Sequence, residues 1–245
     1  KDVPLKAASV FKVIGRPQRR LDGIAKANGT AVFGIDVKRP GMKIAAVAAC
    51  AEFGGSLDGV DEAAALMVRG VRQVLRLPHA VAVVGDHMWA AKQGLLAAAP
   101  RWKPGANAAI DSAWLMAQLD TAAHKPGAVA GRHGDAAAAL AGAAQRIDAV
   151  YRAPLLAHAT MEPMNCTVEV GRDGVDVWVG TQVPTRAQAV AARAAGVAPA
   201  QVRVHNQLLG GGFGRRFEVD FVEQAVLFAR QVSGPLKVVW SREED

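Results

Sequence analysis

The sequence predicts a mixed fold that combines α+β and α/β arrangements. Three observations support this prediction: short alternating apolar runs, helix-like apolar segments between them, and a glycine-rich loop that leaves a strand and enters a helix. The chain has 245 residues, of which 51% are hydrophobic and 21% are charged. This composition is typical of a globular protein with one or two domains.

The first half of the chain predicts an irregular arm followed by a compact α+β domain. In the arm, residues 1–19, Pro4, Gly15 and Pro17 interrupt any periodicity. Alternating or buried apolar runs then predict strands at 31–37, 43–51, 71–77 and 81–84. Helices are expected at 59–68 and from the N-capping Asp86 to Ala98, before Pro100. We expect this domain to cover residues 20–126.

The second half, residues 127–245, favours an α/β arrangement. An alanine-rich zone at 106–144 carries the boundary near 126–131 and a short helix capped by Asp135. Strands are expected at 145–152, 166–170, 175–180, 201–209 and 236–240, and helices at 184–195 and 218–231. The turn at 171–174 predicts a hairpin, and Gly196 should end the helix that Pro184 begins.

Charge and cysteine content exclude several classes of function. The formal net charge is +7, but residues 1–30 alone carry +5 and contain a single aromatic residue, Phe11, so nucleic-acid binding is not indicated. No apolar run reaches the roughly 18 residues of a membrane span. Cys50 and Cys166 lack nearby Cys or His partners, which excludes a disulfide scaffold, a zinc ribbon and an iron–sulfur domain within these residues.

The strongest local feature is a glycine-rich loop at residues 209–216, with sequence LGGGFGRR. Four glycines within five positions permit positive φ and expose backbone N–H groups, as in an anion-binding turn before a helix. Arg215 and Arg216 could add bidentate donors to a phosphate. The loop matches neither the Walker A pattern nor the dinucleotide fingerprint. A tight turn in which backbones pack closely is the alternative interpretation.

Two further loops contain polar groups in apolar surroundings. The first is HATMEPMNC, residues 158–166, in which Glu162 could take part in acid–base chemistry. The favoured interpretation is that Glu162 accepts hydrogen bonds from backbone N–H groups and so orients the loop. His158 is the one histidine that lies in such a segment. The second is GTQVP, residues 180–184, in which Gln182 could donate a hydrogen bond to a cofactor. The favoured interpretation is that Thr181 caps the following helix, which requires no functional role for this loop. Cys166 is expected to be a packed thiol.

These three loops, in this order, resemble the large subunit of the molybdenum hydroxylases, the xanthine dehydrogenase and aldehyde oxidase family. The Arg215-Arg216 pair and the following Glu218-Val219-Asp220 are most similar to the branch of the isoquinoline 1-oxidoreductase β subunit and related aldehyde dehydrogenases. Residues 20–31 resemble the entry to the α/β hammerhead domain of that family. The resemblance implies a hammerhead domain at 20–126 and the first part of a molybdopterin-binding domain at 127–245.

The resemblance also implies roles for individual residues. Gln182 matches the glutamine that hydrogen-bonds an oxo ligand of molybdenum, and Gly212, Phe213 and Gly214 match the loop that contacts the pterin. Gly211 and Arg215 complete the expected cofactor-binding set. In the family the pterin dithiolene holds the metal, so no protein metal ligand is expected.

The implied protein hydroxylates an aldehyde or N-heterocyclic carbon with oxygen from water. It uses a molybdenum–molybdopterin cofactor, in the cytosine dinucleotide form, and passes electrons to a small [2Fe-2S] subunit and then to an acceptor such as a cytochrome. Relatives of the isoquinoline type look exported, which favours the bacterial periplasm over the cytoplasm.

The resemblance departs from the family pattern at two points. Many members carry Gly-Lys in place of Arg215-Arg216, and nothing here matches the catalytic glutamate that lies late in a longer chain. We therefore expect no catalytic residue here, an inactive N-terminal piece of a large subunit, and a partner in the remainder of its own chain. The alternative is a non-catalytic anion-binding or assembly module built on the glycine loop.

Overall fold

The computed structural model describes residues 3–245 and divides the chain into two compact units. The first unit contains the residues up to Lys43 together with Thr160–Val239, and the second contains Ile44–Ala159 and Trp240–Asp245. The predicted domain limits at 19/20 and 126/127 follow a different division and stay a prediction. Within residues 3–245 no helix has the length and apolar character that a bilayer crossing requires.

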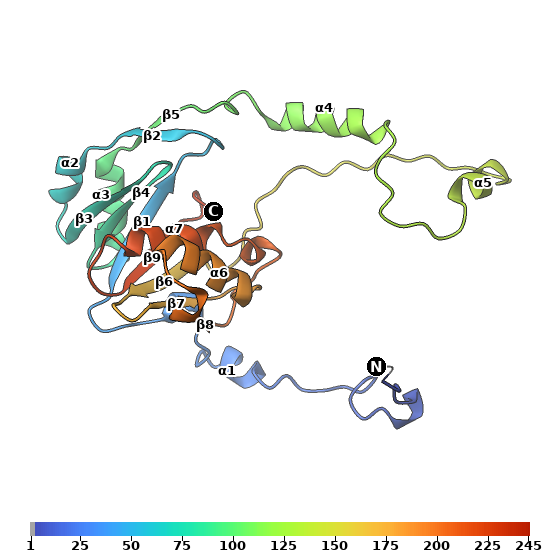
Figure 1. Cartoon of the computed structure of the whole chain (residues 1–245), viewed down its shortest axis with the longest axis horizontal. Coiled ribbons are helices and arrows are strands. Elements are labelled where there is room, and N and C mark those ends of the chain that lie inside the picture. Colours follow the sequence, from blue (N-terminus) through green and yellow to red (C-terminus); the bar gives the residue numbers. More distant parts are fainter. Residues whose placement is uncertain (1–2) are drawn as a thin grey trace. The chain divides into compact units, whose positions relative to one another are not determined.

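The first unit is built on a four-stranded mixed sheet in the order β9-β6-β7-β8 (Figure 1). The strands are β6 (Asn165–Val170), β7 (Val175–Val179), β8 (Val202–Asn206) and β9 (Leu236–Val239). β6 pairs antiparallel with β7 and with β9, whereas β7 and β8 are parallel. The parallel pair is joined through α6 (Pro184–Ala195), which makes β7-α6-β8 a βαβ connection.

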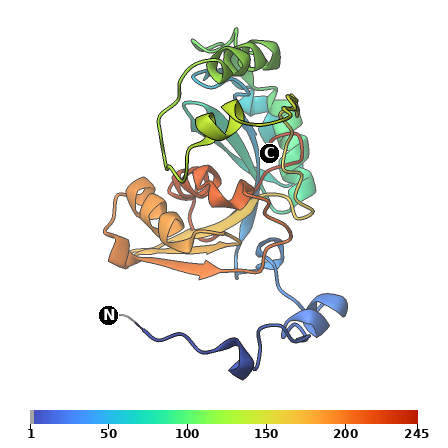
Figure 2. The same ribbon diagram turned by 90° about the vertical axis from the view of Figure 1, so that its right-hand side faces the viewer.

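Two helices, α6 and α7 (Asp220–Ala229), lie side by side on one face of this sheet, as Figure 2 shows. Alternate strand residues such as Val168 and Val177 are fully buried, as are Ala187 and Ala191 of α6 and Phe221 of α7. The period of two in the strands and of about 3.6 in the helices places these side chains in one core. The expected apolar patterning of this unit is confirmed.

Local signals define several boundaries in the first unit as expected. Pro184 is the first residue of α6, and Gly196 ends the helix in the left-handed region with φ +74°. The β6–β7 hairpin closes where Gly171 N donates to Gly174 O at 2.9 Å. The remaining short helical elements are α1 (Gly23–Ala27) and the 3₁₀ turns Ala8–Val10, Gly34–Asp36, Pro199–Gln201 and Arg215–Phe217.

The strand expected at 31–37 is a 3₁₀ turn, η2 (Gly34–Asp36). Asp36 Oδ2 accepts from Phe33 N at 3.0 Å, a local bond that competes with sheet pairing. η2 contacts β6, Lys237 Nζ donates to Ile35 O, and the Arg39 guanidinium lies 4.7 Å from the Trp178 ring centroid.

The second unit contains a three-stranded antiparallel sheet in the order β3-β4-β1. Its strands are β1 (Lys43–Ala49), β3 (Val71–Leu77) and β4 (Ala80–Gly85), and β2 (Ser56–Gly59) pairs separately with β5 (Arg101–Lys103). The helices are α2 (Glu62–Leu66) and α3 (Met88–Ala98). β1, β3, β4 and α3 lie within one or two residues of the expected positions, and α2 is shorter than 59–68. The sequence did not predict β2 and β5.

Asp86 does not cap α3. It forms an ion pair with Arg72 instead, and His87 Nδ1 accepts from Ala90 N at 3.2 Å as the cap. This is a case in which a tertiary ion pair replaces the cap that the local sequence favours.

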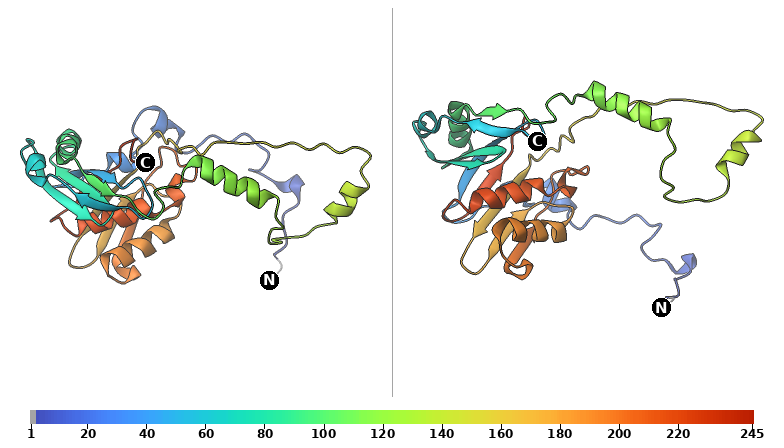
Figure 3. Two further views of the ribbon diagram at one scale, coloured as in Figure 1. Left: turned by 90° about the horizontal axis from the view of Figure 1, so that it is seen from above. Right: turned by 45° about the horizontal axis from the view of Figure 1, so that its top comes forward.

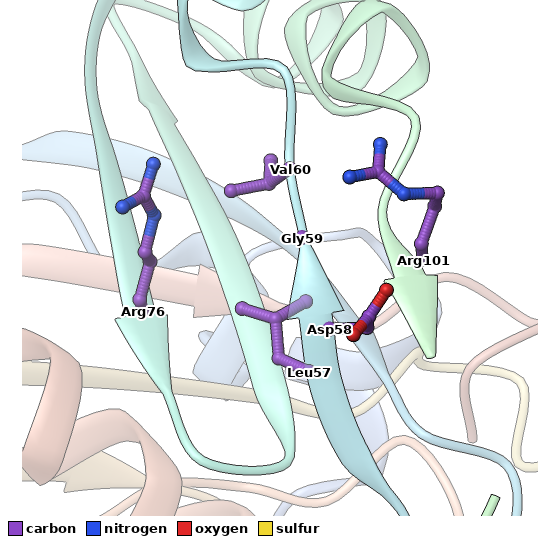
Figure 4. A pocket seen from close by; sticks show the side chains of 6 residues that line it. All are labelled: Leu57, Asp58, Gly59, Val60, Arg76 and Arg101. Carbon is purple, nitrogen blue, oxygen red and sulfur yellow. The ribbon is translucent and has the colours of Figure 1, made fainter. Parts of the chain in front are cut away.

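A hollow of about 300 Å³ beside β2 is lined by Arg76 and Arg101 on either side of the strand (Figure 4). Arg76 pairs with Glu62 at 2.7 Å. A Cβ atom at Gly59 would lie 2.3 Å from Arg101 Nη2, so the glycine makes room for the guanidinium.

The remaining helices of the second unit are α4 (Ser112–Ala123) and α5 (Ala136–Ala141), which Figure 3 shows within long stretches of extended chain. No residue between 106 and 159 is buried. Asp135 caps α5 as expected, with Oδ1 accepting from Ala138 N at 3.1 Å. The α4 helix was not anticipated, although Asp111 caps it in the same way. The strand expected at 145–152 is wrong, because no described strand pairs with this extended segment.

We expect Gly94→Ala to destabilise the second unit although alanine is the better helix former. A Cβ at Gly94 of α3 would lie 2.6 Å from Val71 Cγ2 and 2.7 Å from Val83 Cγ1. Overpacking costs about 1–3 kcal/mol, against a propensity gain of about 1 kcal/mol. Urea unfolding should show a lower midpoint for Gly94→Ala and little change for Gly142→Ala, whose Cβ would meet only Ala138 O at 3.5 Å. Equal midpoints for both variants would contradict the close packing of α3.

A second prediction concerns Asp176 of β7, which lies opposite Arg203 of β8 and bonds both Arg203 and His205. The hydrogen-bonded Arg203 guanidinium, and after it His205, hold the pKa of Asp176 at about 2, below its ordinary 3.8. The contribution of ionised Asp176 to the stability of the fold is therefore complete above pH 4 and disappears as the pH falls through 2. Asp176→Asn should cost about 1 kcal/mol at pH 7, and this difference should be much smaller at pH 2.

The measurement for Asp176 is chemical unfolding at several pH values, with the exposed Asp58→Asn as the control. An equal loss for Asp176→Asn at pH 2 and pH 7 would show that the ion pair is not its origin.

Candidate functional site

Glu162 occupies the loop before β6, is 7% exposed and accepts four hydrogen bonds. Its Oε1 atom accepts from Ile35 N and Asn165 Nδ2, each at 2.9 Å. Its Oε2 atom accepts from Gly210 N at 2.8 Å and Arg216 Nη2 at 2.9 Å. All four acceptor positions of the carboxylate are thus used by the protein. The interpretation that Glu162 orients its loop is confirmed.

Arg216 is the cationic partner of Glu162 and is completely buried. Its Nη2 donates to Glu162 O at 2.9 Å in addition to the carboxylate, Nε donates to Gly211 O at 2.8 Å, and Nη1 donates to Gly180 O at 3.3 Å. The expectation that Arg216 donates to a phosphate is wrong, because its guanidinium binds three loops of the protein instead. A buried cation requires such partners, since an unpaired one is very costly.

The backbone of Arg216 binds the loop that contains Gln182. Its carbonyl oxygen accepts from Gln182 N and from Thr181 Oγ1, both at 3.0 Å. The Thr181 hydroxyl also accepts from Val183 N at 3.1 Å. Thr181 is therefore not the cap of α6, which follows Val183 without a side-chain cap; its hydroxyl serves the contact with Arg216.

Close backbone approach explains two glycines around Glu162. A Cβ at Gly210 would lie 2.3 Å from Glu162 Cβ, and a Cβ at Gly34 would lie 2.6 Å from Asn165 Oδ1. Real Cβ atoms do not approach other atoms this closely, so any larger residue must displace the loop. Close packing is thus the reason for glycine at position 210.

The rest of the glycine loop directs its backbone polar groups in two directions. The carbonyl oxygens of Gly210, Gly211 and Gly212 accept hydrogen bonds from the protein. The N–H groups of Gly211, Gly212 and Phe213 donate to no group within residues 3–245. Positive φ angles at Gly211 (+106°), Phe213 (+51°) and Gly214 (+97°) produce this arrangement. Adjacent free N–H groups in such a turn form a site for an anion or for cofactor oxygens.

Gln182 lies against this loop with its carboxamide oriented by one contact. Its Oε1 accepts from Gly214 N at 3.3 Å, and its Nε2 has no hydrogen-bond partner in the described chain. The side chain is exposed. A Cβ at Gly212 would lie 2.8 Å from Gln182 Oε1, so the absence of a side chain at 212 lets the carboxamide of Gln182 lie against the loop. The amide therefore presents a donor beside the free N–H groups of the loop.

Arg215 forms a bidentate ion pair with Asp220 at 2.9 and 3.1 Å. Asp220 and Glu223 occupy the first turn of α7, so the partial positive charge of this helix end is complemented by the protein's own carboxylates. The expected contribution of the helix to phosphate binding is therefore not supported. The role of Arg215 in cofactor binding stays a prediction.

The other candidate residues are His158 and Cys166. His158 is exposed and belongs to the second unit. Cys166 is buried in β6, and burial raises the pKa of its thiol, as expected for a packed and unreactive cysteine. Within residues 3–245 no group of three or more His, Cys, Asp or Glu side chains could hold a metal ion.

The mixed α/β fold is shared with oxidoreductases of known structure. Quinoline 2-oxidoreductase from Pseudomonas putida 86 superposes with a TM-score of 0.71 at 17% identity, over 95% of this chain and 35% of that one. Isoquinoline 1-oxidoreductase subunit beta from Brevundimonas diminuta is 34% identical over 258 aligned residues, which cover 99% of this chain and 32% of that protein. The aldehyde oxidoreductase molybdenum-binding subunit PaoC of Escherichia coli K12 is 28% identical over 95% of this chain and 35% of that protein.

The model of the molybdopterin cofactor-binding domain matches residues 121–245, about half of the chain. This chain belongs to the molybdopterin cofactor-binding domain family. It spans about a third of the length of the relatives it matches. The resemblance to the molybdenum hydroxylase large subunit is thereby confirmed.

Gly210→Ala should disrupt the packing of the glycine loop against Glu162. The added methyl group would overlap Glu162 Cβ, so we expect a loss of about 2 kcal/mol or more in the free energy of unfolding. The matched control is Gly171→Ala, whose Cβ would lie 3.6 Å from Gly174 O. Thermal unfolding of both variants checks this, and an unchanged midpoint for Gly210→Ala would refute the contact.

Proposed function

We propose that this chain forms part of the molybdenum–molybdopterin site of an oxidoreductase large subunit. The main observation behind this proposal is the position of Gln182. Its Nε2 is a free donor in the described chain and lies beside the unused N–H groups of Gly211, Gly212 and Phe213. These donors fit a cofactor rich in oxygen atoms, and the bare Gly212 allows the Gln182 carboxamide to lie beside them.

The proposed reaction is hydroxylation of an aldehyde or N-heterocyclic carbon, in which substrate and water give hydroxylated product, two electrons and two protons. The molybdenum cofactor supplies the two-electron redox change when it is bound. Gln182 Nε2 donates to a cofactor oxygen, and the loop amides bind the pterin. The names of the relatives, a subunit beta and a molybdenum-binding subunit, support a separate electron-accepting partner.

Several finer features belong to the same proposal. The cofactor is the cytosine dinucleotide form, the electrons pass to a [2Fe-2S] subunit, and the acceptor is of the cytochrome class. Residues 20–126 correspond to a hammerhead domain. Because the chain spans a third of its relatives, turnover depends on sequence that corresponds to their remaining length, including the catalytic base. The proposed compartment is the periplasm.

The test is to purify the natural polypeptide that contains these residues, with the subunits that accompany it. We expect about one molybdenum per polypeptide by elemental analysis, a fluorescent pterin after oxidation, and cytidine monophosphate after acid hydrolysis. Protein that binds inorganic phosphate but contains neither molybdenum nor pterin would support the anion-binding module instead.

Gly212→Val should block cofactor insertion. The valine side chain would displace the Gln182 amide from its contact with the loop and so disturb the donors that face the cofactor. Gly212 does not have a positive φ, so the fold should survive the change. We expect molybdenum content to fall at least about tenfold with little change in the unfolding midpoint, whereas the exposed Gly142→Val keeps its molybdenum. Wild-type molybdenum content in Gly212→Val would refute the assignment of this loop.

A further inference from the structure

We propose that Arg216 is a positioning residue that fixes the cofactor-facing geometry of Gln182 and of the glycine loop. This inference rests on the proposed function and concerns a residue that touches neither cofactor nor substrate. It acts through its hydrogen bonds to three loops that lie far apart in the sequence. Arg216 and Glu162, for example, are 54 positions apart.

The guanidinium sets the first part of this geometry. Its donors bind the carbonyl oxygens of Gly180, Gly211 and Glu162 at 2.8–3.3 Å. Because Gly211 O is held by Arg216 Nε, the peptide groups that follow it present their N–H groups away from the protein. The planar fork of an arginine fixes these directions together, which a lysine ammonium cannot do.

The backbone of the same residue sets the second part. Arg216 O accepts from Gln182 N and Thr181 Oγ1, and Gly214 N, two residues earlier, donates to Gln182 Oε1. The main chain of Gln182 and its carboxamide are thus both held by the segment that the guanidinium anchors. A displacement of Arg216 moves the free amides and Gln182 Nε2 relative to each other.

The charge of Glu162 keeps the guanidinium in this position. Both side chains are buried, and removal of one partner would leave the other charge uncompensated. Arg216→Lys retains the charge opposite Glu162 but loses the fork. It therefore separates the positioning role from the requirement for a buried cation.

The experiment compares wild type, Arg216→Lys and the matched control Arg193→Lys in the natural full-length protein. Arg193 forms an exposed pair with Glu223 between α6 and α7 and does not touch the loops. We expect Arg216→Lys to fold, to show a shifted electron paramagnetic resonance signal of reduced molybdenum, and to lose at least about tenfold in kcat with a smaller change in KM. Arg193→Lys should match wild type in all three measurements.

A milder pair of variants covers the case in which Arg216→Lys fails to fold. Thr181→Val removes one of the two donors to Arg216 O, whereas Thr181→Ser keeps it. The resonance signal should shift in Thr181→Val and return to that of wild type in Thr181→Ser.

The outcomes are distinguishable. Wild-type protein without molybdenum or pterin overturns the proposed function, and the positioning role with it. Molybdenum-containing wild type, together with folded Arg216→Lys and Thr181→Val variants that keep its resonance signal and kcat, overturns the positioning role alone. A shift in those two variants but not in Arg193→Lys or Thr181→Ser supports it.

Discussion

The buried ion pair between Glu162 and Arg216 is the interaction on which the candidate site depends. Both side chains are enclosed by protein, so each must use its hydrogen-bonding capacity internally. Glu162 binds main-chain N–H groups of the η2 turn and of the glycine loop, and Arg216 binds carbonyl oxygens of three loops. Burial of this ion pair is costly, but its hydrogen bonds hold several irregular loops in one specific arrangement.

The same pair explains which groups remain for a ligand. The carbonyl oxygens of Gly210, Gly211 and Gly212 are consumed within the protein. The N–H groups at 211–213 and Gln182 Nε2 are the donors left over. A loop that turns its acceptors inward and its donors outward is selective for ligands rich in oxygen, and this polarity follows from the contacts of Arg216 and Glu162.

Local signals in the sequence predicted much of the fold but little of this network. Pro184 and Gly196 define α6 because both act through their own backbone angles, and the 171–174 turn defines its hairpin in the same way. The pairing of Glu162 with Arg216 has no local signature, because the neighbouring sequence does not distinguish a buried arginine from an exposed one. The strand expected at 145–152 failed for a related reason: alternation describes the side chains, whereas a strand also needs a partner.

The proposed site binds its ligand with neutral donors, although the chain is basic. Arg216 is neutralised by Glu162 and Arg215 is paired with Asp220, so neither loop arginine offers an unpaired charge. Most of the net charge of +7 belongs to residues 1–30. Affinity at this loop should therefore come from the directions of N–H groups fixed in advance by the fold and should depend weakly on ionic strength. A site of this kind tolerates changes of surface charge but not a change in the position of a peptide group, and in this chain that position is set by a residue the ligand does not touch.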